Sequence, residues 1–521
     1  MNFPGTIPVK SIDAKASEYL QYAAAWQTFA DLNEGGSVLR DAVVQSGKYL
    51  LKKPKEPGEV YATRQQRFSY TNLMGNITGW YNAALFKTPP QLIKKPAGAA
   101  ATADAKLGQD ADAYCAAFEK DADRAGTSYI DFWRKVAEAL VLYRSAYVLL
   151  DLPAPEPSAP APASLAEQQS LGQLDPYLVL YPPSQMLNWE TDRYGNLAWC
   201  IIGVTIEERV PFAAPVVMDY WYYFDTQEVA CYQAKRPDQG QRGDADTAQL
   251  VAGYPRRHAM ADQNRIPVRK VEVADGLWLA NRVYLPLLNH LNLDNAFDFG
   301  LFQSALAQLV VIGDYDDAVT MSEVSYLRIP SGGDIKYLEP AGAAYNAIDT
   351  RLQALEERIY KACYLLDQAR TNRSTPAAQS GVSKQQDKTP SRDALSALGD
   401  VLRPAMQAVY ADALAVRGFG DVVPDVRGLD FRDKAGVEEM DFLEKSTVID
   451  IQSDTYRRER DKMFVRAVLS DANPETLTKI DAEIDQNPTP EGAAALAQEQ
   501  ANAQQLDRFS QSFQAAEQVT Q

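Results

Sequence analysis

The chain has 521 residues, and its 69 acidic against 52 basic side chains give a net charge of −17 at pH 7. Two histidines are too few for a histidine-based zinc cage together with a catalytic base. Four widely spaced cysteines, without a C-x-x-C pair, argue against a zinc ribbon or redox dithiol. Affinity for nucleic acid comes mainly from Lys and Arg, so this chain is poorly suited to gripping DNA over a wide surface.

No segment has the sequence pattern of a membrane anchor or of the common enzyme motifs. Residues 1–15 have no apolar signal-peptide core, and Asp298, Gln303 and Gln308 interrupt the most apolar stretch, at 296–312. The chain has no phosphate-binding P-loop, no H-E-x-x-H, no EF-hand loop and no G-x-S-x-G. We therefore expect no metal, no cofactor and no membrane partner. Scattered acids could pair in a glycosidase-like cleft, but no motif points to one.

The first half begins with helical patterns and continues with strand-like ones. Aromatic and aliphatic periodicity predicts helices over 13–34, 61–87 and 129–150. Alternating Pro and Ala at 152–175 predict a stiff, solvated surface insert. Strand-like runs follow at 177–181, 198–205, 216–224 and 228–233. The aromatic run 217–224 would suit base stacking, but core packing is the better interpretation because no Lys or Arg is interleaved.

A long helix is predicted over 276–312, with Asp294 and Asp298 inside its apolar stripe. Two carboxylates one turn apart suit a metal or an acid–base pair. We favour instead that they meet cations of a neighbouring helix or chain, because a buried carboxylate needs a partner. Residues 313–342 are acidic and strand-like, with Asp314, Asp316 and Asp317 near their start.

A second long helix, at 343–367, carries apolar residues at alternating spacings of three and four. Leu352, Leu355 and Ile359 belong to this seam, which predicts packing against another helix. Residues 368–388 then break the pattern and hold four cations, Arg370, Arg373, Lys384 and Lys388, against one acid. Thr389 as N-cap and Pro390 at the first position predict that the next helix starts there and continues to about 417.

The order of these elements resembles a portal protein of tailed bacteriophages. The resemblance covers roughly 55–465 and rests on several local segments. Three segments lie in the first half: the helix at 61–90 that stops at Pro89-Pro90, the helix-to-strand step at 141–151, and the short strand at 266–268. The fourth is the helix–loop–helix at 352–402, which contains a Ser-Gly-aliphatic step at 380–384. The fifth is the turn at 448–455, in which Asp454 occupies the position of the family's usual acid.

The resemblance implies an α+β portal-type fold. Its parts would be a wing at 1–275, a first stem helix at 276–312, a clip at 313–342, a second stem helix at 343–367, a tunnel loop and kinked helix at 368–418, a wing return at 419–450 and a helical crown and tail at 451–521. The insert at 152–175 departs from the family pattern and is expected on the outer surface.

The implied function is a non-enzymatic ring, usually a dodecamer, at the capsid vertex of the virion, made in the host bacterial cytoplasm. Double-stranded DNA would pass through it during packaging and ejection. Implied partners are further copies of the chain, the terminase, head-completion or adaptor proteins, and the major capsid and scaffolding proteins.

Three groups of residues then receive expected roles. Arg370, Arg373, Lys384 and Lys388 would face the DNA, and Asp314, Asp316 and Asp317 would dock partners on the clip. Asp294, Asp298, Leu352, Leu355 and Ile359 would lie between subunits of the stem. Two alternatives stay open: an acidic hydrolase with a carboxylate-lined cleft, and an adaptor that packs helices without forming a ring.

Overall fold

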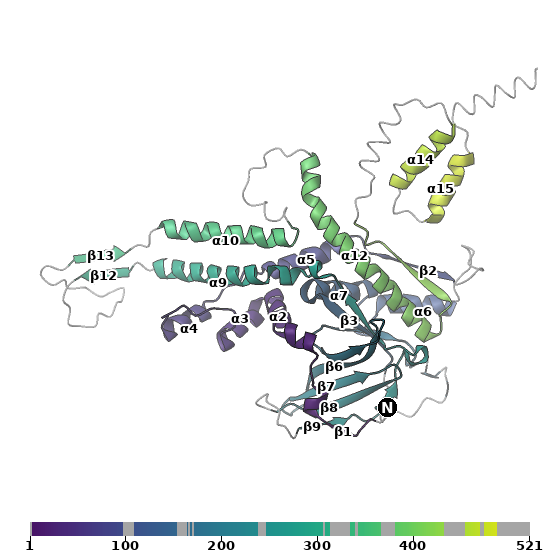
Figure 1. Cartoon of the computed structure of the whole chain (residues 1–521), viewed down its shortest axis with the longest axis horizontal. Helices are drawn as coiled ribbons and strands as arrows, with labels where there is room; N and C mark the ends of the chain where they lie inside the picture. The colour runs from purple at the N-terminus through teal and green to yellow at the C-terminus, as the bar shows by residue number, and fades with distance from the viewer. Residues whose placement is uncertain are drawn as a thin grey trace, which may run out of the picture. The chain divides into compact units, whose positions relative to one another are not determined.

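The fold is that of a computed structural model, shown in Figure 1, which describes residues 3–96, 109–153, 164, 167–168, 171–237, 246–305, 308–312, 334–338, 342–365, 381–431, 454–468 and 474–486. The chain divides into two compact units, Met1–Asp430 and Phe431–Gln521. Helices and strands mix throughout the first unit, in agreement with the expected α+β class. No described helix combines the length and the apolar character needed to cross a membrane.

The first unit contains helices that pack around and beside its sheets. Its α-helices are α1 (Val9–Ile12), α2 (Ser17–Glu34), α3 (Gly36–Ser46), α4 (Gly58–Gln66), α5 (Leu73–Leu85), α6 (Gln109–Lys120), α7 (Tyr129–Tyr143), α9 (Leu279–Ala305), α10 (Gly342–Ala362) and α12 (Gly381–Arg417). Two short 3-10 helices, η1 (Ala261–Gln263) and η2 (Asp275–Leu277), precede α9.

A seven-stranded antiparallel sheet forms the largest β layer of this unit. Its strands are β1 (Thr6–Pro8), β5 (Met186–Thr191), β6 (Leu197–Glu208), β7 (Val216–Phe224), β8 (Glu228–Lys235), β9 (Thr247–Leu250) and β10 (Arg256–Arg257). The order is β1-β9-β8-β7-β6-β5, and β10 also pairs with β8. A second sheet has the order β11-β3-β4 and consists of β3 (Ser145–Asp151), β4 (Tyr177–Tyr181) and β11 (Val268–Glu272).

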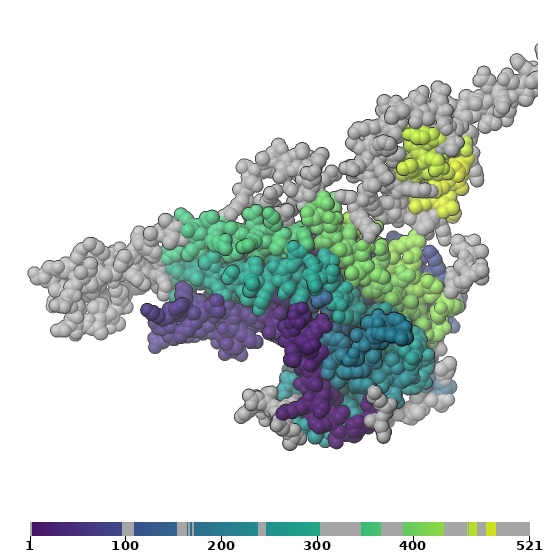
Figure 2. Space-filling view, in the orientation of Figure 1, coloured from purple at the N-terminus to yellow at the C-terminus, as the bar shows by residue number. Residues whose placement is uncertain are grey.

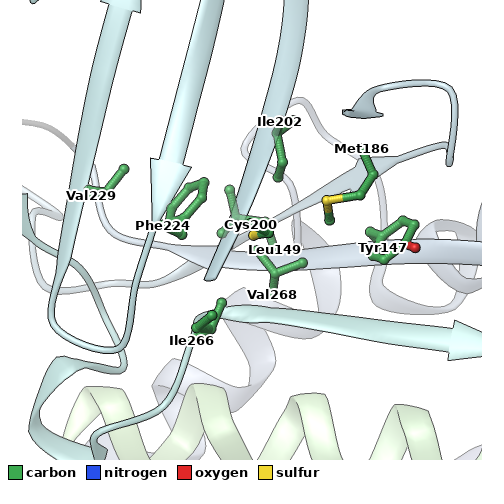
Figure 3. Packing of buried hydrophobic residues seen from close by; sticks show 9 residues of the cluster. All are labelled: Tyr147, Leu149, Met186, Cys200, Ile202, Phe224, Val229, Ile266 and Val268. Atoms are coloured by element: carbon green, nitrogen blue, oxygen red, sulfur yellow. The ribbon is translucent and has the colours of Figure 1, made fainter. Parts of the chain in front are cut away.

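One hydrophobic core lies where these two sheets meet. Leu149 of β3, Cys200 and Ile202 of β6, Phe224 of β7 and Val268 of β11 are among the buried side chains that converge there (Figure 3). Side chains alternate along a strand, so the residue between Cys200 and Ile202 points to the opposite face. That residue, Ile201, belongs to a second cluster. Both faces of the large sheet are therefore covered, and the aromatic run of β7 is core, as the sequence favoured.

Two further pairs of strands complete the first unit. Strand β2 (Gln91–Pro96) pairs with β14 (Val422–Arg427), and β12 (Gln308–Ile312) pairs with β13 (Asp334–Leu338). The second unit contains α14 (Asp454–Val468) and α15 (Pro474–Gln486), which pack on each other. Within it, Lys462 Nζ lies 2.6 Å from Asp485 Oδ1 and links the two helices.

Several predicted helix boundaries are wrong. The helix expected over 276–312 ends at Ala305, and residues 308–312 form strand β12. The helix expected over 61–87 is two helices, because Asn72 caps a new one by accepting a 2.7 Å hydrogen bond from the Gly75 amide. The helix expected over 129–150 ends at Tyr143, where Arg144 takes a left-handed φ of 71° and the chain continues as β3. Helix α12 starts at Gly381 and not at Thr389.

Candidate functional site

The candidate site is the pair of long helices α9 and α10, which lie side by side (Figure 1). A helix rises about 1.5 Å per residue, so the 27 residues of α9 extend about 40 Å. The paired strands β12 and β13 lie at the far end of the two helices (Figure 1). The chain thus leaves the body along α9 and returns along α10.

The base of α9 is fixed to the body by buried contacts. Trp278, which directly precedes the helix, is buried, and its Nε1 donates a 2.8 Å hydrogen bond to the Leu142 carbonyl of α7. The Trp278 ring also packs edge-on against Tyr22 and Phe29 of α2. This aromatic group holds the start of α9 against two body helices and so sets the direction in which the helix leaves.

The apolar seam of α10 packs on α9 of the same chain, which corrects the expected placement between subunits. Leu352, Leu355 and Ile359 are 7 %, 3 % and 0 % exposed in the single chain. Leu287 and Leu291 of α9 are equally buried. The periodicity correctly predicted a helix partner, but the partner is the preceding long helix of the same copy.

The carboxylates of Asp294 and Asp298 meet hydroxyl groups of the same chain. Ser69 Oγ donates a 2.5 Å hydrogen bond to Asp298 Oδ2, and Thr71 Oγ1 lies 3.5 Å from Asp294 Oδ2. Burial raises the pKa of Asp294, and the nearby His290 opposes that shift. The cations expected at these acids are thus replaced by hydroxyl donors from the segment between α4 and α5.

A metal-binding cluster or an activated thiol would be a usual sign of a catalytic centre. Among the residues that the structure describes, no group of three or more His, Cys, Asp or Glu is arranged to hold a metal ion. Burial raises the pKa of the Cys231 and Cys363 thiols to about 12, so neither is an activated nucleophile at neutral pH. An open hollow of about 490 Å³ lies elsewhere, beside Arg144, and its polar lining includes Lys270 and Glu272.

A group that the sequence interpretation missed is the segment between α3 and α4. Lys48, Lys52, Lys53 and Lys55 are all exposed there, with no acid among residues 48–55. We call residues 48–55 the lysine loop. The signal was visible in the sequence, because four lysines within eight residues are unusual in a chain with a net charge of −17.

The lysine loop is held rigidly against α9 and α4. Asn292 of α9 accepts a 2.8 Å hydrogen bond from the Leu51 amide and donates one of 2.8 Å to the Tyr49 carbonyl. Arg64 of α4 donates to the Leu51 carbonyl at 2.7 Å and pairs with Glu56 at 2.8 Å, and both side chains are buried. The lysines are therefore displayed on an ordered backbone.

The remaining predicted site residues fall in two classes. Asp314, Asp316, Asp317, Arg370 and Arg373 lie outside the described residues. Lys384 and Lys388 belong to the first turns of α12, so the expected loop at 368–388 is helical from Gly381 onward.

Farther along, α12 is fixed to the body. The two carboxylate oxygens of Asp412 pair with two arginines: Oδ2 lies 2.6 Å from Arg269 Nη2, and Oδ1 lies 3.2 Å from Arg265 Nη1. The Met406 carbonyl accepts a 2.6 Å hydrogen bond from the Tyr129 hydroxyl of α7. The later turns of the helix therefore pack on α7 and the three-stranded sheet.

Comparison with known proteins gives one family match. A family model described as a domain of unknown function (DUF4055) matches residues 292–411, which begin within α9 and end within α12. A search of curated proteins gives no match.

Solved structures give weak similarities over much of the chain. One is a chain of "Virion of native gene transfer agent (GTA) particle", with a TM-score of 0.36 and 14 % identity. Another is a chain of "Neck of empty GTA particle computed with C6 symmetry", with a TM-score of 0.38 and 13 % identity. Each similarity covers 81 % of this chain and 98 % of the other.

Proposed function

We propose that the chain is one subunit of a portal ring, a non-enzymatic structural protein through which double-stranded DNA enters and leaves a tailed-phage capsid. The observation that carries the proposal is the order along the chain of α9, the β12–β13 pair, α10 and α12. Two long helices that leave and return with a small strand pair at their far end support a stem and clip, with the clip beginning at β12 (Gln308–Ile312), earlier than the residue 313 expected from the sequence.

The exposed surface of the projecting helices supports assembly with further copies. Leu285 of α9 is 68 % exposed, and Leu301 farther along is also exposed, although the rest of the apolar side chains of α9 largely face α10 or the body. Leu285 and Leu301 lie sixteen residues apart, about 24 Å along the helix, so they form two separate contact points and not one apolar patch. In this proposal they replace Leu352, Leu355 and Ile359 as the apolar contacts between subunits.

The remaining assignments form part of the same proposal. Residues 313–342 form part of the clip, where Asp314, Asp316 and Asp317 receive the terminase and later the adaptor proteins. Arg370, Arg373, Lys384 and Lys388 meet phosphates of the passing DNA. A channel with few cations in a strongly acidic chain contacts DNA without retaining it, because phosphate affinity scales with the number of neutralising cations.

Negative-stain microscopy and light scattering of the purified full-length chain test this proposal. The expected result is closed rings with a central hole and a mass that is a whole multiple of 57.6 kDa. Monomers at every concentration and salt condition would contradict the ring. Open filaments, or compact oligomers without a hole, would favour a non-ring adaptor instead.

A further inference from the structure

The lysine loop presents exposed cations together with an exposed apolar side chain. Lys53 lies near enough to Glu56 to help lower the pKa of that carboxyl, and the Lys52 ammonium lies 5.9 Å from the centre of the Tyr61 ring. No ion pair within 4.0 Å joins any of the four lysines to a carboxylate among the described residues. By contrast, Lys15, Lys94 and Lys135 each have a carboxylate within 4.0 Å. Leu51, in the middle of the loop, is 73 % exposed although its backbone is fixed on both sides.

The position of the loop relative to α10 follows from the geometry of α9. Asn292 of α9 holds the loop, and His290 of α9 faces α10, where its Nε2 lies 3.4 Å from Glu356 Oε1. Two residues along a helix differ by about 200° around its axis. The loop and α10 therefore lie on opposite sides of α9, as Figure 1 also shows, and the segment of α3 and α4 forms a projecting edge in Figure 2.

Two pairs of like charges recur along α10, and Glu357 and Lys361 lie between them around the helix. Asp349 and Glu356 are seven residues apart and so share one flank, and Arg351 and Arg358 share another, about 200° away. Asp349 is exposed, and the Glu356 side chain is 42 % exposed. We call Asp349 and Glu356 the acidic flank.

A second copy of the chain fits the lysine loop better than nucleic acid does. The chain as a whole carries a net charge of −17, so its field repels DNA at long range. The exposed Leu51 side chain needs an apolar partner, which a charged phosphate backbone does not offer. An apolar side chain surrounded by charged ones is typical of protein–protein interfaces. In a ring, one side of each subunit meets the opposite side of the next, which brings different surfaces together.

We propose that the lysine loop of one copy docks on the acidic flank of α10 in the adjacent copy. The inference rests on the proposed ring and deepens it by naming a contact between neighbouring subunits. Lys52 and Lys53 meet Asp349 and Glu356 across the interface, and Leu51 packs between them. Because the loop is already ordered, little conformational entropy is lost when the contact forms.

Charge exchange in the full-length chain tests this contact. The loop variant is Lys52→Glu with Lys53→Glu. The matched control, Lys87→Glu with Lys120→Glu, makes the same change in net charge at two exposed lysines outside the loop. The rescue variant adds Asp349→Lys and Glu356→Gln to the loop variant, and Gln keeps an acceptor beside His290. Ring fraction is measured by light scattering and microscopy, and the fold of each variant by circular dichroism.

Support requires that the loop variant stay folded and lose rings at least about tenfold, that the control retain them, and that the rescue variant recover them. If the wild type forms rings and the loop variant forms them equally well, the docking is wrong while the portal proposal stands. Normal rings that bind double-stranded DNA more weakly would assign the loop to nucleic acid instead. A wild type that never forms rings removes both proposals.

Discussion

Tyr81 of α5 donates a 2.8 Å hydrogen bond from its hydroxyl to the backbone carbonyl of Cys363, at the end of α10, and both residues are buried. Cys363 also lies against the beginning of α9, with its Sγ 4.0 Å from the Leu279 carbonyl. The base of the projecting helix pair is thus joined to a body helix at one buried point. This contact fixes how the returning helix enters the body.

We expect Tyr81→Phe to destabilise the chain by about 1–3 kcal/mol, because it keeps the ring but leaves the buried carbonyl of Cys363 without its donor. Urea unfolding followed by circular dichroism measures this change. Tyr194→Phe is the matched control, because Tyr194 is largely exposed. Equal stability of the two variants would show that the hydrogen bond contributes little.

A close approach between α12 and the chain after β14 gives a second prediction. A Cβ atom at Gly399 would lie 2.0 Å from the Leu429 carbonyl oxygen, whereas one at Gly79 in α5 would meet no atom within 4 Å. Gly399→Ala should therefore cost about 1–3 kcal/mol or more through overpacking. Gly79→Ala should stabilise by about 0.5–1 kcal/mol, because alanine is the better helix former. Thermal unfolding of the two variants shows whether Gly399→Ala lowers the stability and Gly79→Ala raises it.

The sequence predicted some strands to the residue but gave no signal for others, such as β5 and β9. Strands β4 and β7 lie at the predicted residues because each is a short apolar run between turn-forming residues. Periodicity missed the end of α7 because Arg144 takes a left-handed φ there without a glycine or proline to signal it, whereas the helix-to-strand step that the resemblance placed at 141–151 is present. The start of α12 was missed because Thr389 and Pro390 imitate a helix start inside a continuous helix.

Periodicity also predicted the packing face of α10 but not its partner. Leu355 has the spacing of a helix–helix seam in either a single chain or a ring, and the pattern is the same in both cases. Which helix covers it depends on the direction in which α9 leaves the body. Contacts far apart in sequence, such as Trp278 with Leu142, set that direction, and no local pattern encodes them.

The two kinds of leucine on the helix pair should respond differently to truncation. Leu355→Ala should cost about 2–5 kcal/mol of single-chain stability, because it leaves a cavity between α9 and α10. Leu285→Ala should change that stability by less than about 0.5 kcal/mol, since its side chain is largely exposed. In the proposed ring, Leu285→Ala should instead weaken assembly, which is measured by the concentration at which rings dissociate.

Asp294 gives a prediction for pH dependence. Its pKa is raised by burial, so the folded chain holds the proton more tightly than the unfolded chain does. Its contribution to stability is therefore lost as the pH rises from the unfolded pKa of about 3.9 through the raised folded value. Asp294→Asn should remove this loss, because Asn keeps an acceptor for Thr71 without a charge.

The measurement is the free energy of unfolding of wild type and Asp294→Asn from pH 4 to neutral pH. The free energy of unfolding of the variant should increase relative to that of the wild type as the pH rises. Ser69→Ala is a useful companion, since it removes the donor to Asp298 and leaves Asp294 unchanged. A difference between wild type and Asp294→Asn that stays constant with pH would rule out a raised pKa at this site.

The proposed DNA contact predicts a salt-dependent loss in a variant that keeps the ring. Replacement of Arg370, Arg373, Lys384 and Lys388 by Ala is a better test than deletion of 368–388, because residues 381–388 form the first turns of α12 and their loss would shorten that helix. Rings of the variant should bind double-stranded DNA more weakly than wild-type rings, and with a shallower dependence on salt, because fewer counterions are released.

The control variant Lys87→Ala with Lys120→Ala removes two exposed cations elsewhere and should bind like the wild type. If the affinity and the salt dependence of the four-residue variant equal those of the wild type, these cations do not meet the DNA, and the channel contact must come from other residues.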